Sequence, residues 1–452
     1  MHNITQSIPS YVLSLIETLR CLLCDADFSA RHRVRPEDFT RQRQLTFPVV
    51  MLFILQKTVK SIQRHLHEFL DELSGGSVFE PVTPGAFTHA RAKLKHTAFI
   101  ELNRYGVLPT VYGPGSAHPL QRWRGHRLLG IDSSLLRLPN HEELFGPFAK
   151  VEVSNSLGKT GLCYPEGRMS VLYDLLNRMG LDGRLESSSM GEVDLAIEQL
   201  AQAQAGDVLV NDRGFTGYRY LAWHHRLGLH YIARCSRGSF AAAQELFRMN
   251  RAGRSMVVKL FAPADQRGEL RRLGLPLELA VRFVSVRLST GELEVLATSL
   301  LEESLYPTEE FLEVYHWRWN HETFYLMMKS RLDLEHFSGQ TAEAIRQDFH
   351  STLLLCNLES VLTGPTTTAM KEQSVEHQHS KQVNRAVAYH ALKDQLLELL
   401  YSETAPERVI GKLQRMFLGS PVSVRPDRKI PRRKFSLCRS YHFQRCLKKI
   451  VF

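Results

Sequence analysis

Four polar residues, Tyr315, Arg318, Glu322 and Lys329, follow one another at steps of 3, 4 and 7 in the segment YHWRWNHETFYLMMK. Because an α-helix turns once in roughly 3.6 residues, these steps place the four side chains on one stripe. Most other residues of the segment are apolar or aromatic, which predicts a buried helix. A buried carboxylate is costly unless it is used, so Glu322 is a candidate metal ligand or acid/base group. The alternative is an ordinary i,i+4 ion pair of Glu322 with Arg318.

Two aspartates stand where apolar runs give way to polar residues. Asp132 follows the run LLGI and Asp212 follows VLVN, so we expect each to lie where a strand ends and a turn begins. In open α/β sheets, ligands gather outside the ends of strands. The alternatives are a helix cap or turn residue for Asp132 and an Asx-type turn for Asp212.

Asp132, Asp212 and Glu322 together would supply oxygen ligands from three separate elements, with no His or Cys at ligand spacing beside them. That donor set favours a hard cation, Mg²⁺ or Mn²⁺. Two such ions, about 3.5–4 Å apart, activate a water or hydroxyl and stabilise the leaving oxygen of a phosphodiester. Arg318 and Lys329 would then hold phosphate charge. In a basic chain, this combination points to phosphoryl transfer on nucleic acid.

The overall charge favours the same class of partner. The 452 residues carry a formal charge of +10 and have a pI of about 9.2, which indicates a polyanion such as nucleic acid, or else a merely basic enzyme. Residues 425–452 hold ten Lys or Arg and one Asp. Aromatic residues interleave with these cations, which suits contact with a DNA backbone. The alternative for this tail is a disordered, solubilising segment.

The elements expected to position these residues fall into three regions: a helical DNA-binding domain at 1–122, an α/β catalytic domain at 123–362, and a helical region with the basic tail at 363–452. In the first, helices are expected over 47–73 and, capped by Thr83, over 84–104. The second helix is basic and could lie against DNA like a helix-turn-helix element, or form a solvated basic face.

The sequence pattern of the middle region is typical of alternating strands and helices, which predicts an α/β core. Residues 237–292 interrupt it with alternating segments that predict a β-rich inserted subdomain. A helical pattern follows at 334–362, then a polar linker at 364–381 and two further helices. The longest apolar stretch, FPVVMLFILQ, is too short to span a bilayer, and the N-terminus is a poor signal peptide, so we expect a cytoplasmic protein without a membrane partner.

The spacing Y-(2)-R-(3)-E-(6)-K at Tyr315, Arg318, Glu322 and Lys329 resembles the signature of the IS-four family of bacterial insertion-sequence transposases. The segments GIDSSLLRLPN, SVLYDLL and GDVLVNDRGF resemble the family's two aspartate segments and the strand between them. The resemblance covers roughly residues 40–355.

The resemblance implies a ribonuclease-H-like core interrupted by the β-rich insertion. It implies a DDE triad of Asp132, Asp212 and Glu322 holding two Mg²⁺ (or Mn²⁺) ions, with Tyr315, Arg318 and Lys329 on the DNA phosphates. The implied enzyme cuts double-stranded DNA at the terminal inverted repeats of its element and joins the freed 3′-hydroxyls to target DNA. It would act as a homodimer, because two ends must be paired, and it would be associated with the bacterial nucleoid.

Two other functions fit parts of this pattern. One is a DNA-binding protein that has lost catalysis and only occupies repeat sequences. The other is a structure-directed nuclease that uses the same carboxylates to cut without joining. The presence of all three carboxylates favours an active enzyme over the first alternative.

Overall fold

The structure is a computed structural model that describes residues 7–41, 43–57, 61–77, 81–154, 160–374 and 379–424. The basic tail therefore lies outside the described residues. Internal contacts divide the chain into two units, residues 1–119 with 330–452, and residues 120–329. The predicted N-terminal and C-terminal regions thus contribute to one unit, which resumes at Ser330, inside the predicted catalytic region. We call them unit 1 and unit 2.

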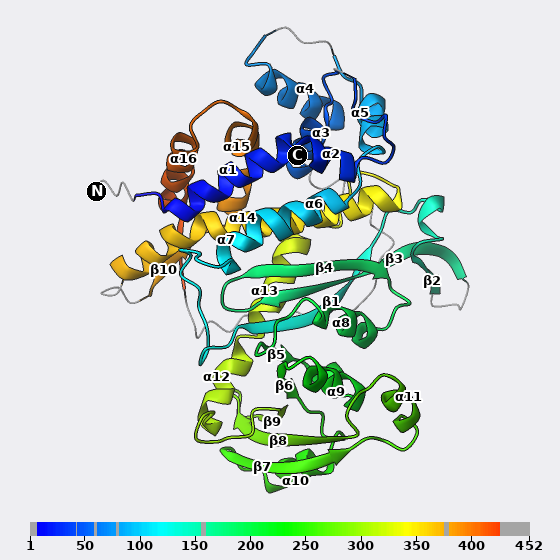
Figure 1. Cartoon of the computed structure of the whole chain (residues 1–452), viewed down its shortest axis with the longest axis vertical. Helices are drawn as coiled ribbons and strands as arrows, with labels where there is room; N and C mark the ends of the chain where they lie inside the picture. The colour runs from blue at the N-terminus through cyan, green and yellow to red at the C-terminus, as the bar shows by residue number, and fades with distance from the viewer. Residues whose placement is uncertain are drawn as a thin grey trace. The chain divides into compact units, whose positions relative to one another are not determined.

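Unit 1 is helical over its described residues (Figure 1). A short antiparallel pair of strands, β10 (Lys381–Val383) and β11 (Pro421–Ser423), accompanies the helices. The helices are α1 (Ser10–Cys24), α2 (Ala26–His32), α3 (Phe47–Leu55), α4 (Ile62–Leu73), α5 (Pro84–Arg91), α6 (Thr97–Glu101), the π-helix η1 (Leu102–Val107), α7 (Leu108–Tyr112), α14 (Ala342–Gln373), α15 (Arg385–Tyr401) and α16 (Pro406–Gly419).

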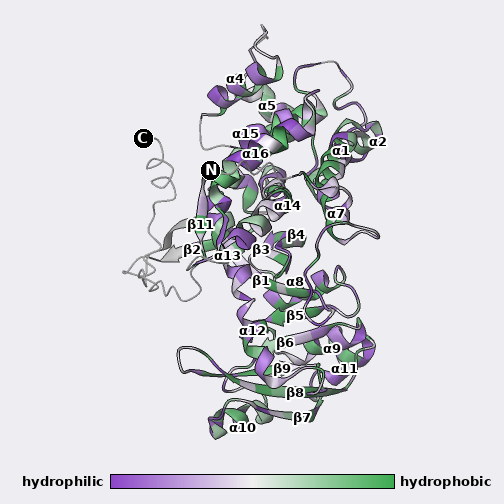
Figure 2. Cartoon of the chain, turned by 90° about the vertical axis from the view of Figure 1, so that its left-hand side faces the viewer, coloured by the Kyte–Doolittle hydropathy of each residue, from purple (hydrophilic) through white to green (hydrophobic). Residues whose placement is uncertain are grey.

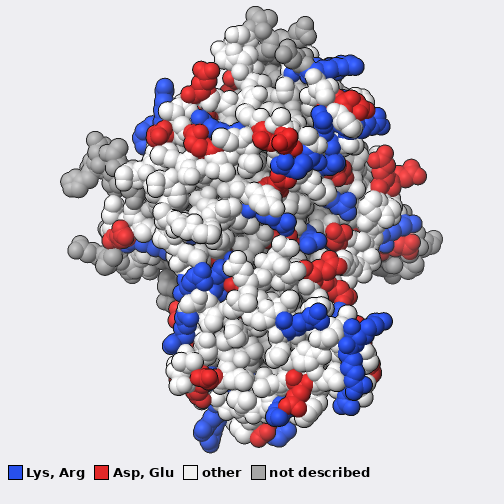
Figure 3. Space-filling view, in the orientation of Figure 1, with Lys and Arg blue, Asp and Glu red and all other residues white. Residues whose placement is uncertain are grey.

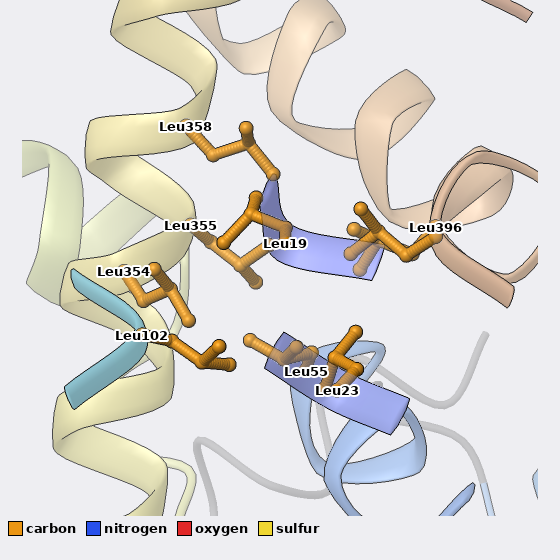
Figure 4. Close-up of a pocket in the computed structure, with 9 residues that line it drawn as sticks. Leu19, Leu23, Leu55, Leu102, Leu354, Leu355, Leu358 and Leu396 are labelled. Atoms are coloured by element: carbon orange, nitrogen blue, oxygen red, sulfur yellow. The ribbon is translucent and has the colours of Figure 1, made fainter. Parts of the chain in front are cut away.

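Leucines from helices far apart in the sequence form the core of unit 1. The buried positions of α1 recur every three or four residues, which turns one face of that helix inward. The leucine side chains surround a small cavity of about 10 Å³ where α1, α3, η1, α14 and α15 meet (Figure 4). The lining residues are Leu19, Leu23, Leu55, Leu102, Leu354, Leu355, Leu358, Leu396 and Leu400.

The expected helices at 47–73 and 84–104 are each broken, so both predictions were wrong in extent. The first divides into α3, whose positions from Val49 to Leu55 are all buried, and α4, which is amphipathic. The second ends at Arg91 and resumes at Thr97. Its predicted start is confirmed, because the Thr83 side chain accepts a hydrogen bond from the Ala86 N–H at 3.1 Å.

Arg91 shows why the second helix is not uniformly basic on its surface. Its side chain is buried, and its guanidinium donates to Gln347, Ser338, the Ala344 carbonyl and Asp348 at 2.6–2.7 Å. Asp348 is itself fully buried on α14. Neither alternative for this helix, an element that contacts DNA or a solvated basic face, therefore holds at Arg91. This arginine ties α5 to α14 inside unit 1.

Helix α14 contradicts the polar linker expected at 364–381. The helix begins at Ala342, with the Thr341 side chain as its cap, and continues to Gln373 through Gly364 and Pro365. Its middle is buried along most of its circumference, because α3, α6, η1, α15 and α16 all pack against it. This tertiary packing outweighs the local helix-breaking tendency of Gly364-Pro365. The two helices predicted after it are confirmed as α15 and α16.

Unit 2 is a mixed α/β unit built on one large sheet, of nine strands within the described residues. The strands are β1 (Leu128–Arg137), β2 (Ala149–Ser154), β3 (Thr160–Asp174), β4 (Met179–Ser187), β5 (Val208–Asn211), β6 (His230–Arg234), β7 (Arg254–Phe261), β8 (Glu278–Arg287) and β9 (Leu293–Thr298). The helices are η2 (Glu142–Leu144), α8 (Glu192–Leu200), η3 (Arg213–Phe215), α9 (Tyr218–Arg226), α10 (Ala241–Met249), α11 (Arg267–Arg272), η4 (Thr308–Glu310), α12 (Phe311–His316), α13 (Trp319–Leu326) and the π-helix η5 (Met327–Arg331), which crosses into unit 1.

The strand order is β2-β3-β1-β5-β6-β9-β8-β7, with β4 also paired to β3. Strand β3 is antiparallel to both β4 and β1, whereas β1, β5 and β6 run parallel. Strand β5 (VLVN) is buried along its whole length and is coloured mostly as hydrophobic in Figure 2, as expected for a central strand covered on both faces. The predicted α/β class is confirmed.

Residues 237–292 do contain β-strands, but they do not form a sheet of their own. Strands β7 and β8 pair with each other, and β8 pairs with β9, so they extend the same sheet that carries β5 and β6. Helices α10 and α11 accompany them. Among the described residues, no helix is both long and apolar enough to cross a membrane.

Candidate active site

Asp132 lies in the middle of β1, not at its end, so the expected strand boundary was wrong. The strand continues to Arg137 because the long β3 pairs with it throughout, with Asp132 opposite Val171. The pairing of β1 with β5 on the other side is recorded only at Leu128 and Leu129. Asp132 therefore stands where β1 extends beyond its parallel neighbour, an open edge of the kind where α/β sheets bind ligands.

Asp212 directly follows β5 and begins the short helix η3, as predicted. The parallel register pairs Leu128 with Val208 and Leu129 with Leu209. Asp132 and Asp212 each come four residues after the first pair of this register, Leu128 and Val208. Two aspartates 80 positions apart in the sequence thus follow the paired residues of two adjacent parallel strands.

The segment that carries Glu322 is not one buried helix. It comprises α12, a tighter turn at Trp317 and Arg318, then α13 and η5. Trp319 is 44% exposed and Leu326 64%, so the expectation of burial on all sides was wrong. The turn nevertheless leaves Arg318 and Glu322 one helical turn apart, as the spacing predicted.

Arg318 connects this segment with the Asp212 turn. Its Nη2 donates to Glu322 Oε1 at 2.8 Å, and its Nη1 lies 4.0 Å from Asp212 Oδ2. The Tyr315 hydroxyl donates to Asp212 Oδ1 at 3.3 Å. Arg318 is only 6% exposed, and its buried Nε has no hydrogen-bond partner among the described residues. A guanidinium with a spare buried donor beside two carboxylates is suited to receiving a further anionic oxygen.

The charge at Asp132 is only partly balanced. Burial, together with the negative charges of Glu192 and Glu322, raises the pKa of Asp132 to about 6, although the Ser133 N–H and Arg318 act in the opposite direction. The Ser133 N–H donates to Asp132 Oδ1 at 2.8 Å. Asp132 interacts electrostatically with Glu322 and with Arg318, and Arg318 in turn lies 4.0 Å from Asp212. A raised carboxyl pKa of this origin marks a place where added positive charge is favourable.

Lys329 contacts β1. Its Nζ donates to the carbonyl of Leu135, three residues beyond Asp132. Tyr315 is buried, and its pKa is raised to about 12, chiefly by burial and also by the charge of Asp212. Tyr315, Arg318, Glu322 and Lys329 thus all face groups on β1 or the β5 edge, or each other.

Comparison with known proteins decides the family. The family model described as the transposase DDE domain matches residues 123–358, which is more than half of the chain. The chain belongs to the transposase DDE domain family. No curated protein matches it. Among solved structures, the cryo-EM structure of the piggyBac transposase synaptic complex with hairpin DNA is similar, with a TM-score of 0.43, 11% identity, and coverage of 92% of this chain and 87% of that chain.

The match to the DDE-domain family covers all six predicted site residues and also residues that sequence reasoning missed. Arg234 ends β6, and its Nη1 lies 3.8 Å from Asp212 Oδ1 while its guanidinium also pairs with the buried Glu294 of β9. The signal that could have found Arg234 is its place at the end of the parallel strand next to β5. Glu192 gave no comparable signal, because it opens helix α8 and does not directly follow a strand, since β4 ends at Ser187.

The chemistry of the donors in this DDE domain fits a hard divalent cation. Asp132, Asp212 and Glu322 supply carboxylate oxygens, and the raised pKa of Asp132 reports negative charge that such a cation would neutralise. With the side chains as they stand, the described residues contain no group of three or more His, Cys, Asp or Glu placed to hold one ion. Glu322 pairs with Arg318 instead, so binding a metal through all three carboxylates requires this pair to rearrange.

Proposed function

We propose that this chain is a DNA transposase of the IS-four type, which cleaves phosphodiester bonds at the terminal inverted repeats of its element and joins the 3′-hydroxyl ends to target DNA. The observation that supports this most directly is that Asp132 and Asp212 follow the paired residues of two adjacent parallel strands, with Arg318 linking Asp212 to Glu322. These residues come from three elements of one unit, inside the segment that matches the DDE-domain family.

Asp132, Asp212 and Glu322 would hold two Mg²⁺ or Mn²⁺ ions. When bound, these ions activate the attacking water or hydroxyl and stabilise the leaving oxygen of the phosphodiester. Arg318 offers a phosphate oxygen its Nε, which has no hydrogen-bond partner in the part of the chain that the structure describes, and the rings of Tyr315 and Trp319 limit hydration of its charge. Tyr315 holds the Asp212 carboxylate through its hydroxyl, and we propose that Tyr315, Arg318 and Lys329 together position the DNA phosphates.

The order of the strands supports a ribonuclease-H-like core for unit 2. An antiparallel meander of β4, β3 and β1 is followed by β5 and β6, which run parallel to β1. In this proposal, β7 and β8 belong to the insertion between the second aspartate and the glutamate, and they extend the core sheet through β9. The chain would act as a homodimer, because joining requires that two ends be brought together.

Unit 1 offers a basic groove for DNA, which supports the proposed DNA-binding role of the N-terminal helices. The groove, with a volume of about 1570 Å³, lies between the segment 35–46 and α5. Figure 3 shows Lys and Arg, with some Asp and Glu among them, on the part of unit 1 that carries α2 and α5. The charged or titratable residues that line the groove are Arg35, Glu37, Asp38, Arg41, Arg43, His89 and Lys93.

Three of these arginines are available to a polyanion. Among the described residues, no ion pair involves the side chains of Arg35, Arg41 or Arg43, whereas Lys93 Nζ lies 3.8 Å from Asp38 Oδ1. Arginines on an exposed groove, without carboxylate partners, suit phosphate contacts that fix the orientation of a duplex. We therefore assign the groove to the DNA backbone.

The decisive experiment is a strand-cleavage and strand-joining assay with the full chain, Mg²⁺ and a duplex that carries the element's own terminal repeat. We expect cleavage and joined products with the wild type, and neither with Glu322→Gln. Asp212→Asn should bind the repeat within about threefold of wild type yet not cleave it, because it keeps its size and loses only its charge. Cleavage without joined products would favour the nuclease, and repeat binding without cleavage by the wild type would favour the inactive DNA-binding protein.

A further inference from the structure

A fourth carboxylate, Glu192, enters the neighbourhood of Asp132 from α8. Glu192 is the first residue of that helix, and its Oε1 accepts a hydrogen bond from the Ser133 hydroxyl at 2.6 Å. The Arg168 Nη1 donates to the same hydroxyl at 2.9 Å. The Ser133 side chain is therefore held from two sides, by a cation on β3 and an anion on α8.

This arrangement acts on Asp132 through the backbone. The N–H of Ser133 donates to Asp132 Oδ1 at 2.8 Å, so fixing the Ser133 side chain also fixes the donor that orients the carboxylate. The Asp132 carbonyl is held separately, by the Tyr325 hydroxyl at 2.6 Å and the Ser170 hydroxyl at 3.2 Å. The backbone around Asp132 is thus restrained by several hydrogen bonds. Glu192 supplies the charged acceptor that holds Ser133 from the side of α8.

Glu192 also reaches the turn that carries Asp212. A Cβ atom added to Gly214 would lie 3.8 Å from Glu192 Oε2, so this carboxylate lies against the backbone just after Asp212. Its two oxygens therefore face two different elements, β1 through Ser133 and the β5 turn at Gly214.

We propose that Glu192 is a positioning residue of the metal site: by holding Ser133, it keeps the Asp132 carboxylate in the orientation that binds the divalent cation. The inference rests on the proposed function, since that function supplies the cation. Residues that orient metal ligands are typically worth about 10–100-fold in metal affinity. Electrostatic interaction between Glu192 and Asp132 is consistent with their closeness.

The test measures Mn²⁺ binding to the full chain by electron paramagnetic resonance, without DNA, so that it does not depend on turnover. The variants are Glu192→Ala, Glu192→Gln, Ser133→Ala and the double variant Glu192→Ala/Ser133→Ala. Asp132→Asn reports loss of a direct ligand. Glu198→Gln is the matched control, because Glu198 is exposed on the same helix. Thermal melting of each variant checks that the fold is kept.

We expect Glu192→Ala and Ser133→Ala each to weaken Mn²⁺ binding about 10–100-fold. The double variant should be no worse than either single one, because both changes remove the same restraint. Glu192→Gln keeps an acceptor for the Ser133 hydroxyl and should stay within about threefold of wild type. Glu198→Gln should bind like wild type.

The inference would be overturned if Glu192→Ala bound Mn²⁺ with wild-type affinity. It would also be overturned if Glu192→Ala and Glu192→Gln lost Mn²⁺ affinity equally, because that would show that the charge of Glu192 matters and the hydrogen bond does not. If either result came with normal Mn²⁺-dependent cleavage by the wild type, only this inference would fail. If the wild type bound no Mn²⁺ and cut no DNA, or if Asp132→Asn bound Mn²⁺ normally, the proposed metal site would fail and the inference with it.

Discussion

The buried ion pair between Arg91 and Asp348 gives the sharpest stability prediction. Replacing Arg91 with Met keeps much of the side-chain volume but removes four hydrogen bonds from the interior of unit 1. Asp348 would retain the N–H and hydroxyl of Ser338, and Lys57 Nζ at 3.8 Å. The pKa of Asp348 is held below its ordinary value because Arg91 and Lys57 outweigh the effect of burial, so its charge depends on these cations.

The expected loss of unfolding free energy is about 3–5 kcal/mol, the usual result of removing one partner of a buried pair. The lower part of that range is favoured, because Ser338 and Lys57 still solvate the carboxylate. Gln347 Oε1 loses its guanidinium donor at the same time, which adds about 1 kcal/mol. A second change, Asp348→Asn, should recover part of the loss, because it removes the unpaired buried charge.

The measurement is urea unfolding followed by circular dichroism, with Lys93→Met as the control on the exposed side of the same region. Lys93 is 45% exposed and pairs with Asp38 at 3.8 Å, so its loss should cost less than about 1 kcal/mol. The reasoning would be refuted if Arg91→Met unfolded like the wild type and instead weakened DNA binding. That result would place Arg91 on an outward basic face.

Three further predictions follow from other features. Arg41→Ala combined with Arg43→Ala should weaken binding to any duplex and lower the salt slope of log K by about 2, measured by fluorescence anisotropy over a salt series; an unchanged slope would show that the groove does not touch DNA. Leu355→Ala should lower the unfolding free energy by about 2–5 kcal/mol in denaturant titration, since it enlarges the leucine-lined cavity; a loss below 1 kcal/mol would contradict close packing there. Burial lowers the pKa of His224 to about 4, so on acidification this histidine takes up a proton in the unfolded state before it does so in the folded state. The free energy of unfolding should therefore be constant above pH 6.5 and fall by about 3 kcal/mol as the pH drops to 4. His224→Leu should flatten this pH dependence, measured by urea unfolding at each pH.

The sequence singled out both aspartates, but it predicted the end of the strand correctly only at Asp212 and not at Asp132. For Asp212, the apolar run VLVN ends where β5 ends, because the strand is central and fully buried. For Asp132, the run ends although the strand continues, because β3 supplies hydrogen-bond partners for several more residues. Local hydropathy reports burial, and burial ended at Asp132 while strand pairing did not. Only the pairing partners, far away in the sequence, could reveal the difference.

The glutamate segment shows the same limit for helices. The spacing of Arg318 and Glu322 correctly predicted neighbours, since a step of four survives small changes in helix geometry. The apolar pattern overstated burial, because the exposed Trp319 and Leu326 resemble core residues in composition. Glu192 escaped notice because its role depends on Ser133 and Gly214, two residues from other elements.

The discontinuity of unit 1 has a consequence for how the protein is made. When residue 329 leaves the ribosome, the whole of unit 2 has been synthesised, but α1, α3 and η1 still lack α14 and α15, which complete their leucine core. Until the last helices emerge, those leucines have no native partners and remain open to association with other chains. A product of interrupted translation would therefore carry the three carboxylates of unit 2 together with a helical core that lacks α14 and α15.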